Sequence, residues 1–220
     1  MPRLSPGEQL VTYARRLLSD RLTTGTGGNL SLADRAGKRI FITPSGLPYD
    51  QLAADQVSVI NFAGRLLQGE KPSSEWQLHL EIYQARPEIN AVVHTHSPFA
   101  TTFAVLNRPI PACHYLVGVG GGDEIRVAPY ATFGTPELAR VTAKALGGDN
   151  CILMANHGLI AVGENLTDAY HAALYIEETA ELCWRAQVLG EPVILSAAEM
   201  EKARERLGVY AGRPEKDSLF

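Results

Sequence analysis

The stretch Ala91-Val92-Val93-His94-Thr95-His96-Ser97-Pro98 joins an apolar run to a His-x-His pair and then to a helix start. The apolar run predicts a buried strand, and Ser-Pro is typical of a helix cap followed by the first helical residue. Because side chains two residues apart on an extended chain point to the same side, His94 and His96 are expected to face one pocket. Two neutral imidazoles held in this way suit a zinc-like ion, although a pair of uncoordinated histidines at a strand end is the alternative.

Two further stretches offer ligands of the kind that would complete such a site. The segment 72–76 (PSSEW) places Glu75 at a helix start, and the segment 155–158 (ANHG) places His157 after the apolar run 151–154. Three histidines and one carboxylate form a candidate catalytic metal site, provided that one coordination position can open to substrate.

The overall composition is that of an ordinary globular protein. The chain has 220 residues, 45% of them hydrophobic and 20% charged, which fits one domain over residues 1–220. The net charge of −4 provides no basic field, so nucleic acid is not an expected partner. No apolar run approaches the length of a membrane span, and the odd number of scattered cysteines favours a reducing cytoplasm.

Helix and hairpin signals alternate along the chain. Ser5 with Glu8 forms a capping box for a first helix to about Asp20, and Ser74 with Gln77 forms another for a helix that stops before Pro87. Further helices are expected over 99–106, 135–146, 168–189 and 197 to about 207, with the tail from about 208 loosely ordered. Strands are expected at 30–32, 39–42, 57–60, 65–67, 125–127, 151–154 and 159–162. Hairpins mixed with helices predict a mainly antiparallel sheet covered by helices.

Two loops combine glycine with hydroxyl side chains. They are segments 23–29 (TTGTGGN) and 43–46 (TPSG). Glycine lets backbone N–H groups approach an anion closely, although a tight turn without a ligand is the favoured interpretation of the first loop taken alone. The first loop is neither a Walker loop nor a dinucleotide fingerprint, because no Gly-Lys-Ser/Thr follows it and a helix rather than a strand precedes it.

Taken together, these motifs resemble the class II aldolase/adducin family. The matching stretches, in one order with similar spacing, are 25–29, 42–46, 72–76, 91–96, 114–115, 128–135 and 156–161. The resemblance implies an α/β fold, a three-layer α/β/α sandwich around a mainly antiparallel central sheet. It also implies a cyclic homotetramer with active sites between subunits.

The resemblance assigns a role to each matching residue. His94, His96 and His157 look like zinc ligands, and Glu75 looks like a fourth ligand that becomes the base when substrate displaces it. The phosphate cradle would comprise Gly28, Asn29, Thr43, Ser45, Gly46, Ser73 and Ser74. Tyr115 looks like an acid from the adjacent subunit, and Phe133 and Tyr210 match pocket-lining positions. His79, four residues after Glu75, is expected to pack or to support a ligand rather than to bind the metal.

The implied activity is zinc-dependent cleavage of a ketose 1-phosphate, with L-fuculose 1-phosphate as the leading substrate and dihydroxyacetone phosphate and L-lactaldehyde as products. Mn²⁺ or Co²⁺ could replace zinc. Aldolases of 5-deoxyribulose 1-phosphate or methylthioribulose 1-phosphate are close alternatives. The next alternative is an L-ribulose-5-phosphate 4-epimerase, which carries Asp where Glu75 stands. A methylthioribulose-phosphate dehydratase follows, whose pattern lacks the Ser-Ser-Glu stretch. An adducin-like binding module would have lost the three histidines. Departures at Gly27, Thr95 and Asn156 leave the aldehyde end of the substrate open.

The residue chemistry agrees with a metal-dependent mechanism. Breaking a ketose phosphate beside its carbonyl leaves an enediolate, whose negative charge must be stabilised. A Schiff-base aldolase uses a desolvated Lys for this purpose, but none of the five lysines lies in an apolar strand. A cation that polarises the carbonyl is therefore the expected solution.

Overall fold

The computed structural model describes residues 4–210 of the chain. The helices are α1 (Pro6–Ser19), α2 (Trp76–Ala85), α3 (Pro98–Val105), α4 (Pro136–Leu146), α5 (Leu166–Leu189) and α6 (Ala197–Tyr210), with the 3-10 helices η1 (Ala54–Gln56) and η2 (Tyr115–Gly120). The strands are β1 (Asn29–Asp34), β2 (Arg39–Ile42), β3 (Ser58–Asn61), β4 (Leu66–Gln68), β5 (Ala91–Thr95), β6 (Val127–Ala128), β7 (Cys151–Met154) and β8 (Gly158–Gly163).

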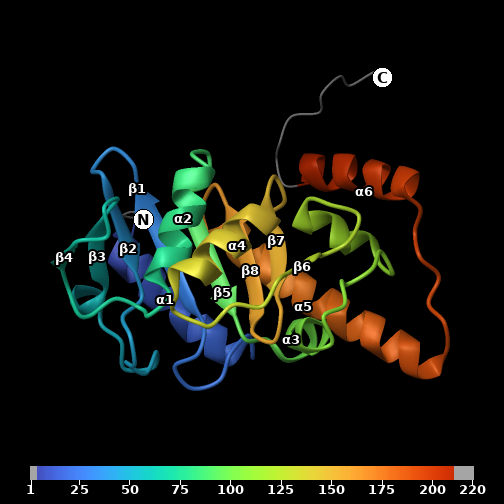
Figure 1. Ribbon diagram of the computed structural model, residues 1–220, viewed down its shortest axis with the longest axis horizontal. Helices are drawn as coiled ribbons and strands as arrows, with labels where there is room; N and C mark the ends of the chain where they lie inside the picture. The colour runs from blue at the N-terminus through green and yellow to red at the C-terminus, as the bar shows by residue number, and fades with distance from the viewer. Residues whose placement is uncertain (1–3, 211–220) are drawn as a thin grey trace.

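All of these strands form one eight-stranded sheet in the order β4-β3-β2-β1-β5-β8-β7-β6 (Figure 1). Every neighbouring pair is antiparallel except β6 and β7, which are parallel. The predicted mainly antiparallel sheet is therefore confirmed. The run 125–127 forms less strand than expected, because Ile125 makes an isolated bridge with Ile110 and only Val127 and Ala128 join β7.

Alternation along the central strands builds the three layers. On β5, Ala91 and Val93 pack into one core while Val92 packs into the other. The first core contains residues of α1, α3, α5 and α6, and the second contains residues of α2 and α4 (Figure 1). Because successive strand residues point to opposite faces, a fully apolar strand serves both cores at once. The structure is thus the three-layer sandwich that the resemblance implies.

The helix starts follow the capping rules, with one correction. Ser5 and Glu8 form the predicted capping box of α1, and Thr135 caps α4. The box predicted for Ser74 and Gln77 is wrong, because the N-cap of α2 is Glu75 and makes no side-chain capping bond. The amide of Trp76 donates to the Ser73 carbonyl in a turn, so the helix begins later than the box requires.

The last helix also runs further than expected. We expected it to end near Leu207, whereas α6 continues to Tyr210. A glycine inside a helix costs only about 1 kcal/mol relative to alanine, so Gly208 does not terminate it. Residues 211–220 of the expected loose tail lie outside the described residues.

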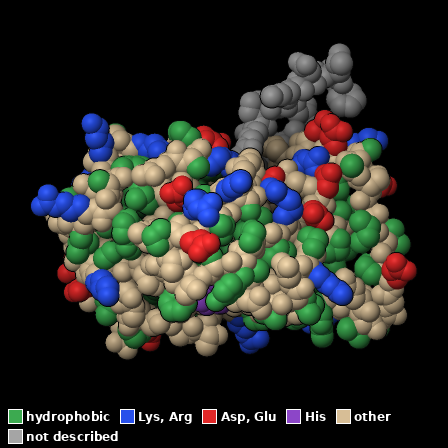
Figure 2. All heavy atoms as spheres, in the orientation of Figure 1, with side chains coloured by type: hydrophobic (Ala, Val, Ile, Leu, Met, Phe, Trp, Pro, Cys, Tyr) green, Lys and Arg blue, Asp and Glu red, His purple; other side chains and the backbone are tan. Residues whose placement is uncertain are grey.

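Charged side chains of both signs cover one face of the described structure (Figure 2), and its helices are not of the membrane-spanning kind. None of its helices is both long enough and apolar enough to cross a bilayer. Figure 2 shows Lys and Arg side chains interspersed with Asp and Glu over the face seen in Figure 1. The three cysteines are free thiols: Cys151 and Cys183 are buried, and Cys113 is half-buried.

Candidate active site

His94 stands near the end of β5, at the centre of the sheet. Its Cα is paired with Asn29 of β1 on one side and with Ile160 of β8 on the other. Directly opposed residues of neighbouring strands project to the same face. That face is covered by α2 and α4, because Val92 and Ile160 pack into their core. The register therefore places Asn29 and His94 together beneath the start of α2.

A backbone carbonyl determines which nitrogen of His94 can bind a metal. His94 Nδ1 lies 3.0 Å from the carbonyl oxygen of Leu159 on β8. Since a carbonyl oxygen only accepts hydrogen bonds, Nδ1 carries a proton, and the neutral form of the ring therefore has its lone pair on Nε2. That Nε2 atom lies 3.0 Å from His96 Nε2, just past the end of the strand.

His157 reaches the same point from the turn between β7 and β8. Asn156 has a φ of 56°, a left-handed conformation that asparagine tolerates better than most residues. The His157 amide closes the turn by donating to the Met154 carbonyl at 3.0 Å. The ring centres of His94 and His157 are 4.8 Å apart, and one nitrogen atom of each histidine in the trio lies within 4.8 Å of the others.

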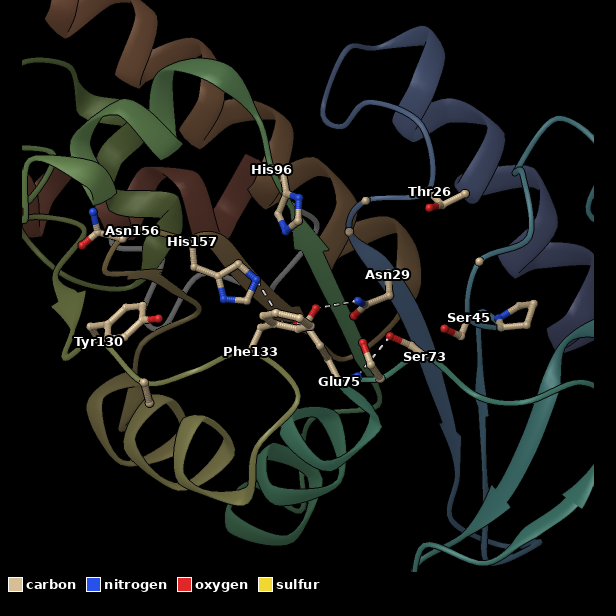
Figure 3. A pocket seen from close by; sticks show the side chains of 16 residues that line it. Thr26, Asn29, Ser45, Ser73, Glu75, His96, Tyr130, Phe133, Asn156 and His157 are labelled. Atoms are coloured by element: carbon tan, nitrogen blue, oxygen red, sulfur yellow. Dashed lines mark hydrogen bonds and ion pairs between the residues drawn. The ribbon is translucent and has the colours of Figure 1, made fainter.

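Glu75 completes the cluster from the N-terminus of α2. Its Oε2 lies 3.2 Å from His94 Nε2, and its Oε1 lies 3.2 Å from His157 Nε2. Asn29 Nδ2 donates to Oε2 at 2.9 Å (Figure 3). Burial opposes ionisation, but His94, His157 and the Asn29 amide outweigh it and hold the pKa of Glu75 well below its usual range. The carboxylate is thus a permanent anion facing three imidazoles.

This donor set fits a divalent cation. Nitrogen and oxygen ligands about 2.0–2.2 Å from a tetrahedral zinc ion lie roughly 3.3–3.5 Å from one another, close to the 3.0 Å separation of the His94 and His96 Nε2 atoms and to the 3.2 Å separations of the His94 and His157 Nε2 atoms from the Glu75 oxygens. Burial, followed by the influence of the neighbouring His94, lowers the pKa of both His96 and His157 to about 4, so their rings are neutral at neutral pH. Among the described residues, Glu75 Oε1 is buried and has no hydrogen-bond partner. A buried oxygen of this kind needs a partner, and a bound cation would provide one.

The carboxylate of Glu75 faces a cavity of about 570 Å³. Figure 3 shows Ser45 and Ser73 on the side of this cavity that lies away from His157. The residues expected to hold phosphate that line it are Gly28, Asn29, Ser45, Gly46, Ser73 and Ser74. The amide N–H groups of Gly28, Gly46 and Ser74 donate to no acceptor within the described residues. Because no Lys or Arg is among the lining residues, these amides and the hydroxyls are the donors that an anion would meet.

Glycine is required at position 28 for two reasons. Its φ of 66° is left-handed, and a Cβ there would lie 2.6 Å from the carbonyl oxygen of His94. The backbone of the Gly-rich loop therefore touches the metal-binding strand directly. The tight-turn and anion-loop interpretations of segment 23–29 are both compatible with this geometry.

Three residues predicted from the sequence lie apart from this cavity wall. Thr43 is buried, and its Oγ1 accepts the Leu30 amide at 3.1 Å instead of lining the cavity. Tyr115 is exposed on η2, where its ring packs on His114, and it is not among the residues that line the cavity. Tyr210 ends α6, and its side chain lies outside the described part of the structure.

Phe133 lines the cavity as predicted, and the structure adds neighbours that sequence reasoning left without a role. Thr26, Tyr130, Ala131 and Asn156 also line it. All four lie within or beside the motifs noted above, which is the only signal that marked them. Tyr130 and Phe133 are both largely exposed, so two aromatic rings stand at the cavity mouth.

Comparison with known proteins agrees with this architecture. Residues 8–184 match the family described as Class II Aldolase and Adducin N-terminal domain. The chain belongs to this family. It is 45% identical to the 5-methylthioribulose-1-phosphate/5-deoxyribulose-1-phosphate aldolase of Rhodospirillum rubrum, covering 94% of this chain and 93% of that protein. It is 41% identical to the 5-deoxy-D-ribulose 1-phosphate aldolase of Bacillus thuringiensis serovar kurstaki, covering 92% and 95%.

A solved structure of an L-fuculose 1-phosphate aldolase superposes on this fold with a TM-score of 0.90. The two share 41% sequence identity, and the match covers 94% of this chain and 98% of that one. The chain is therefore a class II aldolase, an enzyme class that uses a divalent metal. The histidine trio and Glu75 are the residues that fit such an ion.

Proposed function

We propose that this class II aldolase reversibly cleaves a ketose 1-phosphate between C3 and C4, giving dihydroxyacetone phosphate and a short aldehyde, with zinc as its metal. One observation carries the proposal: a cluster of three imidazoles and an ionised carboxylate borders a cavity that unpaired amide donors also line, and His96, His157 and Glu75 of this cluster face the cavity. The first set suits a cation, and the second suits a phosphate. A sugar phosphate needs both at the same time.

The aldehyde end of the substrate is proposed to be small and apolar. The aromatic rings of Tyr130 and Phe133 at the cavity mouth suit a methyl or methylthio group better than a hydroxylated chain. The two curated relatives above are named for 5-deoxyribulose and methylthioribulose phosphates. We therefore favour a 5-deoxyribulose 1-phosphate or its methylthio analogue, with L-fuculose 1-phosphate, the leading expectation from sequence, as the competing substrate.

Binding the phosphate would hold the reacting carbons beside Glu75. The free amides of Gly28, Gly46 and Ser74, with the hydroxyls of Ser45 and Ser73, are the proposed cradle. The amide of Ser74 precedes α2, whose positive end favours an anion. Positioning of this kind removes much of the entropic part of the barrier. Thr43 would act behind this wall, by holding the β1 backbone through Leu30.

Proton transfers are assigned to two side chains. A bound divalent cation supplies polarisation of substrate oxygens and lowers the pKa of the group that it binds. In the cleavage direction, the C4 hydroxyl loses its proton, the C3–C4 bond breaks, and C3 gains a proton. Glu75 is proposed to return the proton to C3 and to remove it in the condensation direction. Tyr115 is proposed to exchange the proton of the C4 oxygen.

Tyr115 is proposed to act in the active site of a neighbouring subunit. This requires an oligomer, and we propose that the protein assembles as a cyclic homotetramer. The exposed position of Tyr115 outside the cavity of its own protomer supports that assignment. We also propose a cytoplasmic location, which free thiols at all three cysteines support.

A substrate panel tests the proposal. Zinc-loaded and chelator-treated protein would be assayed for dihydroxyacetone phosphate released from 5-deoxyribulose 1-phosphate, 5-methylthioribulose 1-phosphate and L-fuculose 1-phosphate, with L-ribulose 5-phosphate as the epimerase control. We expect a kcat/KM at least about tenfold higher for the 5-deoxy or methylthio substrate, equivalent to ~1.4 kcal/mol of transition-state binding. A preference for L-fuculose 1-phosphate would reverse the substrate assignment. Epimerisation without any triose phosphate would refute the aldolase proposal.

A further inference from the structure

Two elements meet behind the active site through an alternating row of polar side chains. Glu75, His79 and Tyr83 are spaced four residues apart and therefore lie on one face of α2. Asn29 and Ser31 are two residues apart on β1 and project to one face of the sheet. The contacts run from Tyr83 to Ser31, then to His79, Asn29 and Glu75, crossing between helix and strand at every step.

The hydrogen-bond distances in this row are short, and all of its side chains are buried. The Tyr83 hydroxyl lies 2.6 Å from Ser31 Oγ, which lies 2.6 Å from His79 Nδ1. His79 Nε2 lies 2.5 Å from Asn29 Oδ1, and Asn29 Nδ2 lies 2.9 Å from Glu75 Oε2. His79, Ser31 and Tyr83 are fully buried, and Asn29 is only 4% exposed. Water therefore cannot replace any partner in this row at low cost.

The directions of these hydrogen bonds follow from one end. A carboxylate only accepts, so Asn29 must face Glu75 with its NH₂ group and His79 with its carbonyl oxygen. That oxygen also only accepts, so His79 Nε2 carries the proton. Burial, followed by the nearby His94, lowers the pKa of His79 to about 3, so the ring is neutral and its Nδ1 accepts from Ser31. Ser31 in turn accepts from Tyr83, and every donor points toward Glu75.

We propose that His79 is a positioning residue, whose Nε2–H group holds the Asn29 amide so that its NH₂ faces Glu75. The inference rests on the proposed function, in which Glu75 is the base. An amide that turned over would present its oxygen to the carboxylate and repel it. With the NH₂ facing Glu75, Oε2 is held and Oε1, which accepts no hydrogen bond within the described residues and lies 3.2 Å from His157 Nε2, is left for the cation or for the proton.

Two substitutions separate this role from general packing. His79→Gln places an amide donor near the position of Nε2, whereas His79→Asn places its amide near Nδ1 and leaves Asn29 without a donor. We expect both zinc-loaded variants to lose similar thermal stability and to keep their metal content. Only His79→Asn should lose kcat, by about tenfold or more with KM little changed, and His79→Gln should stay within about threefold of the parent. Equal kcat values for the two variants would overturn the proposal.

The tautomer can be read without substrate and without a variant that folds poorly. Selective ¹⁵N-histidine labelling of the parent holoenzyme, with the His79 signal assigned by its loss in His79→Gln, reports which ring nitrogen carries hydrogen; if that variant does not fold, the signal is assigned by its through-space contacts with Asn29 and Ser31. We expect a neutral ring protonated on Nε2, and a ring protonated on Nδ1 would refute the inference. If the parent cleaves no sugar phosphate, the proposed function fails on its own, while the tautomer still decides the role of His79.

Discussion

Glu75 combines two properties that usually exclude each other, burial and a permanent negative charge. It is 6% exposed, yet the neighbouring imidazoles and the Asn29 amide keep it ionised. An anion so stabilised is a poor base until a competitor takes its partners. Substrate oxygens entering the cavity can do so, which couples proton transfer to substrate binding.

Glu75→Gln should therefore abolish most of the rate while keeping the metal, because three histidines remain. We expect a loss of roughly 10²–10⁴-fold in kcat, the usual scale for a positioned acid–base group. Exchange of the carbon-bound proton of dihydroxyacetone phosphate with solvent should fall in parallel. Glu81→Gln, on the same helix but outside the cavity lining, is the control. Proton exchange at the parental rate in Glu75→Gln would assign the base to another residue.

Two glycines in the Gly-rich loop have nearly the same backbone conformation but different surroundings. Gly25 has a φ of 63° with nothing within 4 Å of an added Cβ, whereas a Cβ at Gly28 would meet the His94 carbonyl oxygen at 2.6 Å. Gly25→Ala should cost only the left-handed penalty of about 1–2 kcal/mol. Gly28→Ala should cost roughly 1–3 kcal/mol more, because the clash pushes β1 away from β5. Denaturant unfolding measures both, and equal losses would show that the loop relaxes freely.

Helix α3 begins two residues after His96, a proposed metal ligand, and its cap comes from another helix. Ser97, the N-cap, makes no side-chain capping bond. Instead the Glu177 carboxylate on α5 accepts the amides of Phe99 and Ala100, both at 2.8 Å. These bonds tie α3 to α5 and hold the segment that carries His96. Capping from a residue 77 or 78 positions away is invisible to local sequence rules.

Glu177→Gln should weaken both the fold and the metal site. An amide can accept one of the two bonds but turns a donor toward the other amide, so we expect a loss of about 1–2 kcal/mol in unfolding free energy. Metal affinity, measured by competition with a chelating dye, should fall severalfold as His96 loses its support. Glu178→Gln, an exposed neighbour on α5, is the matched control. If both variants bind metal equally well, the cap has no bearing on the site.

Across the whole molecule, the proposed metal site joins elements that are distant in the chain. Glu75 comes from α2, His94 and His96 from β5 and the residues just after it, and His157 from the turn between β7 and β8. A ligand that binds only the native state stabilises it by about 4 kcal/mol at a thousandfold excess over its Kd. Removing the ion should therefore lower Tm by roughly 2–4 °C for each kcal/mol lost.

Calorimetry with and without a chelator measures this shift in Tm. Adding back Zn²⁺, Mn²⁺ or Co²⁺ then identifies the ion that restores most of the lost Tm. The variant His157→Gln should show a much smaller chelator effect, because one ligand is already missing. A Tm that is unchanged by a strong chelator in freshly purified parent protein would argue against a bound metal.

The proposed shared active site predicts complementation between inactive subunits. Tyr115→Phe and Glu75→Gln should each be nearly inactive as pure assemblies. Co-refolded mixtures should regain activity, because some sites then pair an intact Glu75 with an intact Tyr115 from the neighbour. Tyr115→Phe should keep its metal, which separates it from a folding defect. A mixture as inactive as its parts, or a fully active monomer, would place the whole site within one chain.

The local sequence pattern was sufficient to predict many of the strands and the candidate ligand residues. The apolar runs at β5, β7 and β8 predicted strands because alternating residues of a buried strand must serve two cores. The histidines and Glu75 could be proposed as ligands because few residue types bind zinc, and the His-x-His spacing predicted a common direction for His94 and His96. Both arguments use only neighbours in the chain, where backbone geometry limits the outcome. The box predicted for Ser74 was wrong because a turn closed by the Trp76 amide and the Ser73 carbonyl precedes the helix, whose N-cap is Glu75.

Contacts between distant segments required the folded chain. Asn29 lies beside His94 only because β1 pairs with β5 in one register, and a shift by one residue would turn its side chain to the other face. The spacing of Glu75, His79 and Tyr83 is visible in the sequence, but it does not show which strand packs against that face of the helix. Their partners on β1 are 46 to 52 residues away. Such pairings depend on how α2 packs against the sheet, because that packing decides how many buried polar groups across the layer are left without a hydrogen bond. Local secondary-structure propensity carries no information about that number.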